Sequence, residues 1–203
     1  MKLYPLFLLM ATATVFSPGP GVVMTLTNAM RYGLRGTFGG IVGIAFGALV
    51  VAAISATSVG VILATSAVAF SVLKLVGAAY LIFLGVKLWR APAFRFTEKA
   101  THTASFQRRF LEGVSLQLTN PKAIFFFLSI FPQFIDPKLN YGFQFSVLVL
   151  TYSTLIILIH TSYALFAGRA KGWLTSEKGS KTVNKAGAAT FIFFGAALAT
   201  AKR

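Results

Sequence analysis

The most constraining feature of this sequence is a double proline break inside a long apolar segment. Phe16-Ser17-Pro18-Gly19-Pro20-Gly21 interrupts an apolar run over residues 3–27. Proline lacks an N–H group and its ring clashes with the preceding turn, so a helix over this run must break there. Inside a membrane the freed N–H and C=O groups are costly unless protein, water or a solute satisfies them. The break is therefore a candidate binding site.

A second proline break lies at a corresponding place in the other half of the chain. Thr119-Asn120-Pro121-Lys122-Ala123 falls inside an apolar run over residues 113–135. Paired interruptions in corresponding halves are typical of secondary transporters whose solute site lies near the bilayer midplane. The spacing predicts one transmembrane domain over residues 1–203, with repeat one at 1–89 and repeat two at 113–203.

The composition is that of a membrane protein. Of 203 residues, 56% are hydrophobic and 11% are charged, against about 25% charged in soluble domains. Six spans of about 20 residues use most of the chain, which leaves no room for a soluble domain. The chain has no cysteine, two histidines and four acidic residues. We therefore expect no disulfide and no metal site.

The apolar runs predict six spanning helices. Residues 36–73 contain no charged side chain, and as one helix they would be about 57 Å long, nearly twice the hydrocarbon thickness. They must therefore form two spans, with a turn near residues 64–66. Residues 90–109 are polar and basic without an apolar period, which predicts a basic loop over 90–112. The expected spans are residues 3–27, 37–63, 67–88, 113–135, 143–167 and 186–201.

The positive charges predict the orientation. Most of the 19 lysines and arginines fall in the loops after the first, third and fifth spans. The positive-inside rule places these loops in the cytoplasm and both termini in the periplasm. The net charge of +15 then reflects topology and anionic lipid headgroups, and we expect no nucleic-acid partner.

Because each half has three spans, the halves insert in opposite directions. The fold class is an all-α integral membrane protein of six transmembrane helices, arranged as two inverted three-helix repeats with helices 1 and 4 broken.

The first break offers opposite partial charges to a solute. Carbonyl groups are free around Val15 and Phe16, and N–H groups are free around residues 21–23. These can pair with the ammonium and carboxylate of an amino acid, whereas the alternative is a kink that only shapes packing. The candidate substrate-binding residues are Ser17, Pro18, Gly19, Pro20, Gly21, Asn120, Pro121 and Lys122.

Four polar side chains within the spans are candidates for functional or structural roles. Lys122 lies too deep to snorkel easily, so its ammonium either holds a substrate carboxylate or caps carbonyls freed at the second break. Lys74 either snorkels or supports the site. Asn120 is a good helix N-cap. His160 is a packing residue or a proton carrier.

Glycines at four-residue spacing predict a smooth helix face. Gly39, Gly43 and Gly47 lie on one side of the second span, which favours close helix packing and allows a homodimer. The spans contain no cluster of nucleophile, base or metal ligands. We therefore expect no catalytic residues and no enzyme.

The motifs together resemble one transporter family over essentially the whole chain. They are Ser17-Pro18-Gly19-Pro20, the Gly39 to Gly47 series, Leu73-Lys74-Leu75-Val76-Gly77-Ala78-Ala79-Tyr80-Leu81 with Leu84-Gly85, Asn120-Pro121-Lys122-Ala123, Pro132-Gln133-Phe134-Ile135-Asp136-Pro137, and Tyr163-Ala164-Leu165-Phe166-Ala167-Gly168. With these the sequence resembles the LysE/RhtB amino-acid exporters. The resemblance implies a bacterial inner-membrane exporter of amino acids or close derivatives, driven by the proton gradient without a cofactor.

One position departs from the family pattern. Many relatives carry an aspartate just after the glycine matched by Gly47, and here that residue is Ala48. The remaining candidates for proton coupling are Asp136 and His160, and either could be structural.

Two alternatives to amino-acid export stay open at this point. One is a uniporter or exporter of another small metabolite, and the other is a membrane assembly subunit that transports nothing.

Overall fold

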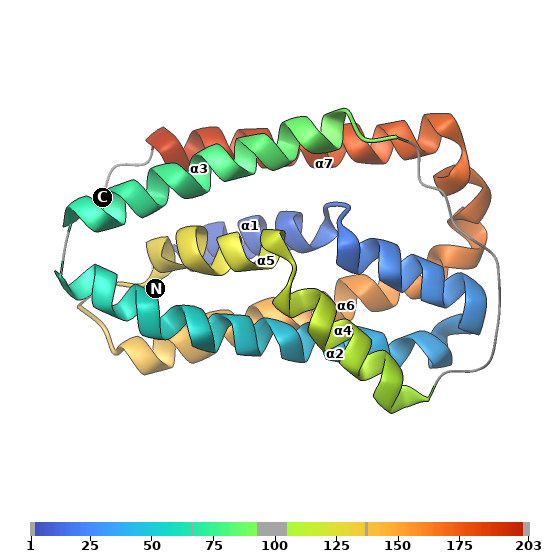
Figure 1. The fold of residues 1–203 in the computed structure, drawn as a ribbon, viewed down its shortest axis with the longest axis horizontal. Coiled ribbons are helices and arrows are strands. Elements are labelled where there is room, and N and C mark those ends of the chain that lie inside the picture. Colours follow the sequence, from blue (N-terminus) through green and yellow to red (C-terminus); the bar gives the residue numbers. More distant parts are fainter. Residues whose placement is uncertain (1–2, 66, 93–104, 137, 201–203) are drawn as a thin grey trace.

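The computed structural model describes residues 3–65, 67–92, 105–136 and 138–200, and every regular element within them is a helix (Figure 1). The expectation of an all-α protein is confirmed. The side chains of some residues inside these ranges, Lys74 among them, lie outside the described part. The elements are α1 (Tyr4–Phe16), α2 (Pro20–Thr65), α3 (Ala67–Trp89), α4 (Phe106–Leu118), α5 (Pro121–Phe125), the π-helix η1 (Phe126–Ile130), the 3-10 helix η2 (Phe131–Phe134), α6 (Tyr141–Thr175) and α7 (Glu177–Thr200).

Both expected proline breaks are present. α1 ends at Phe16, Ser17 is extended with φ −66° and ψ 142°, and α2 begins at Pro20. At the second break, α4 and the segment Pro121–Phe134 meet at an angle of 53°. Pro132 lies in η2, and its missing N–H group prevents a regular α-helix from continuing through this region.

α2 contains a reversal at Gly33. This residue has φ 65° and ψ −173°, a conformation that glycine adopts without a steric penalty. The chain turns back on itself there, at the right-hand end of the view in Figure 1. The reversal lies between the expected first and second spans. The expected turn near residues 64–66 also agrees with the structure, because α2 ends at Thr65 and α3 begins at Ala67.

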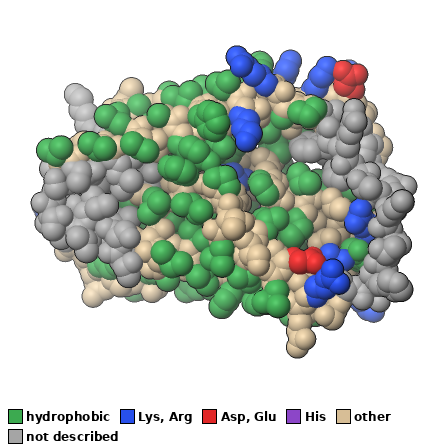
Figure 2. All heavy atoms as spheres, viewed as in Figure 1, with side chains coloured by type: hydrophobic (Ala, Val, Ile, Leu, Met, Phe, Trp, Pro, Cys, Tyr) green, Lys and Arg blue, Asp and Glu red, His purple; other side chains and the backbone are tan. Residues whose placement is uncertain are grey.

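The surface and the helix lengths fit a membrane protein. Among the described residues, Pro20–Ala56 and Tyr141–Ala167 are long and apolar enough to cross a membrane, and the bent pair Phe106–Leu118 and Pro121–Phe134 is a third candidate if counted as one span. Hydrophobic side chains cover much of the visible face, while Lys and Arg lie in the right-hand half (Figure 2). That half contains the Gly33 reversal and the junction of α6 with α7 (Figure 1).

Two basic segments expected as connections are partly helical. α4 begins at Phe106, so the prediction of a basic loop over residues 90–112 is wrong for residues 106–112. Ser105 explains the early start, because its hydroxyl oxygen accepts a hydrogen bond from the Arg108 N–H at 3.4 Å. The basic segment between the fifth and sixth spans is helical on both sides of Ser176. Lysine and arginine are good helix formers, and a basic residue does not end a helix.

Glycines set the contact between α2 and α4. A Cβ added to Gly43 would lie 2.1 Å from the Phe110 carbonyl oxygen, and one added to Gly113 would lie 2.4 Å from the Gly40 carbonyl oxygen. Gly39 and Gly47 face α4 in the same way, at 2.7 Å from the Phe106 carbonyl oxygen and from the Gln117 Cβ respectively. The two backbones therefore approach as closely as their atoms allow.

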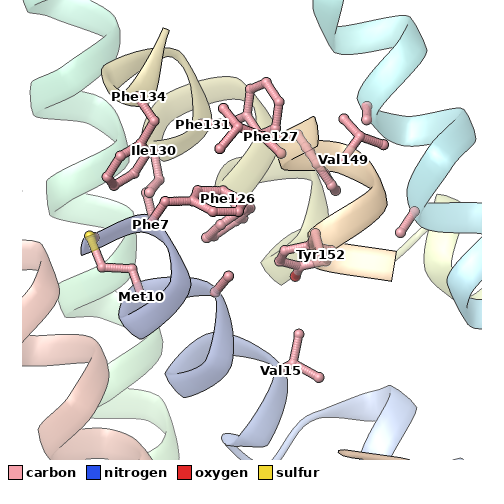
Figure 3. Packing of buried hydrophobic residues seen from close by; sticks show 14 of the residues in the cluster. Phe7, Met10, Val15, Phe126, Phe127, Ile130, Phe131, Phe134, Val149 and Tyr152 are labelled. Atoms are coloured by element: carbon pink, nitrogen blue, oxygen red, sulfur yellow. The ribbon is translucent and has the colours of Figure 1, made fainter. Parts of the chain in front are cut away.

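A buried aromatic cluster joins α1 to η1, η2 and α6 (Figure 3). The Phe7 ring is fully buried and packs edge-on against Phe134 at a centroid distance of 5.3 Å. Tilted and edge-to-face pairs of this kind add to the stabilisation from burial alone. The cluster consists of Phe7, Phe126, Phe127, Phe131, Phe134 and Tyr152.

We predict that Gly43→Ala destabilises the protein by about 1–3 kcal/mol, because the new methyl group overlaps the Phe110 carbonyl and forces α2 and α4 apart. Thermal unfolding of the purified protein in detergent measures the loss. Gly142→Ala is the matched control, since its Cβ would meet only the Asn140 Oδ1 at 3.6 Å. Equal melting temperatures for both variants would contradict the close contact.

Candidate functional site

The first break leaves acceptors at the end of α1. The carbonyl oxygens of Thr14 and Ser17 accept hydrogen bonds from Lys122 Nζ at 2.8 and 2.9 Å, and Ser17 Oγ lies 3.4 Å from the same nitrogen. The Phe16 carbonyl oxygen accepts from the Tyr163 hydroxyl at 2.6 Å. The Thr14 carbonyl oxygen also accepts from the Ser17 hydroxyl at 2.8 Å. Side chains from the other half of the chain thus pair the Phe16 and Ser17 carbonyl groups that the break leaves free.

The second break is organised by Asn120. Its Oδ1 accepts from the Lys122 N–H at 3.1 Å and so caps the N-terminus of α5. Its Nδ2 donates to Gln117 Oε1 at 3.3 Å. The side chain therefore spans the interruption, with one atom bonded to each side. Asn120 is buried, so both contacts form away from bulk water.

Lys122 connects the two breaks directly. The residue starts on α5 and its ammonium ends on α1, while the Phe191 ring lies 5.8 Å from Nζ. Of the two expected interpretations, the geometry fits carbonyl capping, but the carbonyls belong to the first break and not to the second. Gly19 makes room for the ammonium, because an added Cβ would lie 3.1 Å from Nζ.

A cavity lies between the two breaks. Its volume is about 20 Å³, which is room for about one water molecule. The first break contributes Gly21 and the second contributes Asn120 and Lys122, so the cavity combines both candidate segments. The full lining is Val15, Gly21, Val22, Ile44, Gln117, Asn120, Lys122, Tyr152, Ile156 and His160.

His160 is part of this lining. Its Nδ1 lies 2.7 Å from Thr25 Oγ1, so α6 and α2 share a buried hydrogen bond. The other edge of the ring packs on Gly21, where an added Cβ would lie 3.2 Å from Cε1 and 3.9 Å from Nε2. The sequence identified this histidine, and the structure places it beside the first break.

The other expected residues lie elsewhere. Asp136 lies in the segment before α6, where its Oδ1 accepts from the Lys138 N–H at 3.0 Å and its N–H donates to Gln144 Oε1 at 2.9 Å. It does not line the cavity. The side chain of Lys74 lies outside the described part of α3.

Sequence reasoning missed Gln117 and Tyr152, together with the apolar wall formed by Ile44 and Ile156. Gln117 had a detectable signal, because a polar amide three residues before Asn120 in an apolar span has to find a partner. Tyr152 and the isoleucines had none, since similar residues occur throughout the spans.

A polar contact joins α2 to α4 between the breaks and the Gly33 end. Arg109 Nη1 donates to Asn28 Oδ1 at 3.3 Å and to Glu112 Oε2 at 2.8 Å, and its guanidinium lies 4.2 Å from the centre of the Tyr32 ring. Arg109 Nε and Asn28 Nδ2 are buried without partners in the described part of the chain. Such a contact holds α2 to α4 while leaving hydrogen-bonding capacity unused.

The aromatic cluster lies on the other side of the breaks. Phe7 lies on α1 upstream of the break and contacts residues of η1 and η2 downstream of the second break (Figure 3). Asn28 and Arg109 lie on the other arms of the same two interrupted helices. The aromatic cluster and the polar contact therefore lie on opposite sides of the two breaks.

The fold and the site define a helical membrane protein with a small cavity between two interrupted helices. The chain belongs to the LysE-type translocator family, whose model matches residues 12–202. This family consists of amino-acid efflux transporters, so the expectations of a translocator and of no enzyme are confirmed.

Individual relatives cover nearly the whole chain. A homoserine/homoserine lactone efflux protein of Salmonella typhi is 35% identical over 97% of this chain and 95% of its own length. A leucine efflux protein of Salmonella typhimurium is 30% identical over 97% of this chain and 94% of its own length. An uncharacterized membrane protein of Vibrio cholerae is 34% identical over 94% of each chain. No solved structure matches.

We predict that Lys122→Met destabilises the protein by about 2–5 kcal/mol, because the Thr14 and Ser17 carbonyl groups lose a charged donor in buried surroundings. Thermal unfolding in detergent measures the loss. Lys138→Met is the control, since Lys138 is exposed. Equal melting temperatures for the two variants would show that the ammonium does not hold α1 in place.

Proposed function

We propose that this protein is a secondary transporter that exports a small amino acid or a close derivative across the bacterial inner membrane. The observation that carries the proposal is the cavity between the two interrupted helices, crossed by the side chain of Lys122. Exposed backbone dipoles at such interruptions can bind a zwitterion without any acidic side chain. The names of the relatives, which include homoserine and leucine efflux proteins, support this substrate class.

The proposed architecture is six spans in two inverted halves. In the first half, α1 with the beginning of α2 forms a broken span, and the remainder of α2 and α3 form two more. In the second half, α4 with Pro121–Phe134 forms the broken span, followed by α6 and α7. The corresponding positions of the two breaks support this division.

The proposed orientation places the basic end in the cytoplasm. Arg31, Arg35, Arg108 and Arg109 lie near the Gly33 end, and the positive-inside rule assigns that end to the cytoplasm. Both termini then lie in the periplasm. Anionic headgroups would contact the basic end.

We propose alternating access, in which the polar contact between Arg109 and Asn28 closes the cavity toward the cytoplasm and the aromatic cluster closes it toward the periplasm. Separation of Arg109 from Asn28 would open the cavity toward the cytoplasm, and separation of Phe7 from η1 and η2 would open it toward the periplasm. The proton gradient is the proposed driving force, and no cofactor is required. The bond between His160 and Thr25 makes His160 a candidate for the coupling group.

We predict that proteoliposomes containing the purified protein accumulate homoserine or leucine when a pH gradient is imposed. A protonophore should reduce the accumulation to the level of protein-free liposomes, because the gradient then vanishes. Accumulation is measured as the radiolabelled solute that the liposomes retain when they are collected on filters. Accumulation that a protonophore does not change would indicate a uniporter, and no movement of either solute would favour an assembly subunit.

We predict that Arg109→Met increases cytoplasmic access to the cavity, because α2 then loses its polar contact with α4. The native chain has no cysteine, so Val22→Cys supplies a single reporter in the cavity lining. A charged methanethiosulfonate reagent applied to inside-out vesicles should label it faster, by about 5-fold or more for a loss of about 1 kcal/mol.

Arg108→Met is the control for this experiment. Arg108 also pairs with Glu112, at 3.3 Å, but its side chain is 74% exposed. The Arg108→Met variant should therefore be labelled at the same rate as the protein that carries only Val22→Cys. If both arginine variants accelerate labelling equally, the contact between Arg109 and Asn28 is not the cytoplasmic closure.

A further inference from the structure

Gln117 points to a function that helix packing does not explain. It lies in the last turn of α4 and is only 3% exposed. Its Oε1 accepts from Asn120 Nδ2 at 3.3 Å, and its own amide nitrogen makes no hydrogen bond to another described residue. Because Gln117 lines the cavity, this nitrogen is a donor available to a solute.

His160 supplies a second donor once its tautomer is considered. Its Nδ1 contacts Thr25 Oγ1, and this is the one hydrogen bond of the Thr25 hydroxyl within the described structure. If the hydroxyl donates to Nδ1, both atoms of this hydrogen bond are satisfied, and the ring proton resides on Nε2, which makes no hydrogen bond to another described residue. With the opposite polarity, the buried hydroxyl proton would lack an acceptor, which is costly. Nε2 therefore carries the proton, in a ring that lines the cavity.

The first turn of α2 adds two backbone donors. The N–H groups of Gly21 and Val22 meet no acceptor in the described part of the chain, and both residues line the cavity. Helix N-termini direct such groups, and a positive partial charge, along the axis toward the preceding break. The Lys122 ammonium lies at that break.

Acceptors in the lining are few. No aspartate or glutamate of the described ranges lines the cavity. The Val15 carbonyl oxygen accepts no backbone hydrogen bond within the described ranges, and the Tyr152 hydroxyl makes no hydrogen bond to another described residue. Donors thus gather around Gln117, His160 and the start of α2, while Val15 and Tyr152 offer acceptors.

We propose that Gln117 and His160 bind the acyl oxygens of the transported solute, while Lys122 holds the two breaks together. The acyl group is the carboxylate of an amino acid or the ester carbonyl of a lactone, and the solute ammonium pairs with the Val15 carbonyl and the Tyr152 hydroxyl. This inference rests on the proposed export of amino acids or their derivatives. It makes Gln117 and His160 specificity-determining residues.

The test compares a charged with an uncharged acyl group. Proteoliposomes with the wild-type protein or with Gln117→Glu are assayed by counterflow with two pairs of probes: homoserine with homoserine lactone, and leucine with leucinamide. Protein-free liposomes correct for diffusion. Gln117→Glu keeps the side-chain shape and the oxygen that accepts from Asn120, but it replaces the free donor with an acceptor.

We expect Gln117→Glu to raise the KM for the carboxylate probe by about 10-fold or more and the KM for its uncharged counterpart by less than about 3-fold. Carboxylate transport should recover as the pH falls, because the introduced carboxyl group then takes up a proton and can donate. Equal changes for both members of a pair would overturn the assignment. A wild-type protein that moves none of the four probes would overturn the proposed function, and this inference with it.

His160 is tested by replacements of two kinds. His160→Gln keeps a donor near the position of Nε2, whereas His160→Leu removes it. We expect the glutamine variant to stay within about 3-fold of the wild-type KM and the leucine variant to exceed it by about 10-fold. Gln117→Met, which has a similar shape and no donor, should also raise the carboxylate KM if Gln117→Glu does not fold. A wild-type KM in His160→Leu would overturn the role of His160.

Discussion

The structure depends on pairing the carbonyl groups that the end of α1 exposes. A helix that stops inside apolar surroundings loses several kcal/mol for each unsatisfied group, and the prolines make this stop unavoidable. Lys122 and Tyr163 supply the donors from the second half of the chain. A local backbone defect thus becomes a contact between distant segments, and the position of α1 relative to α5 and α6 follows from it.

The two interrupted helices arrange the rest of the site around this contact. Their upstream and downstream arms diverge from the breaks, so each side of the breaks carries one arm of each helix. Aromatic rings fill one side, where the packing is apolar. On the other side a guanidinium joins an amide and a carboxylate. The two closures therefore differ in chemistry, and water would weaken the polar one more readily than the aromatic one.

The sequence predicted the helical class, both breaks and most helix ends, because prolines and apolar runs act locally. It also identified Lys122 and His160, since a charged or titratable group in an apolar span stands out. The partners of Lys122 were not predictable, because they depend on the rotation of α5 relative to α1. Tyr152 was missed for a related reason: in a span that is apolar on all sides, no stripe indicates which face lines a cavity. The early start of α4 depends on the Ser105 cap, which composition alone does not reveal.

The glycine contacts have a mechanical consequence. Where the part of α2 after Gly33 meets α4, Gly43 and Gly113 bring backbone against backbone, whereas Gly85 and Gly195 admit the side chains of Ile192 and Ile82 between α3 and α7. Surfaces in such close contact separate only if many atoms lose contact at once. The part of α2 after Gly33 with α4, and α3 with α7, should therefore each move as a rigid unit, while the part of α2 before Gly33, which carries Asn28, can separate from α4. Movement would then concentrate where bulky side chains meet, between such units.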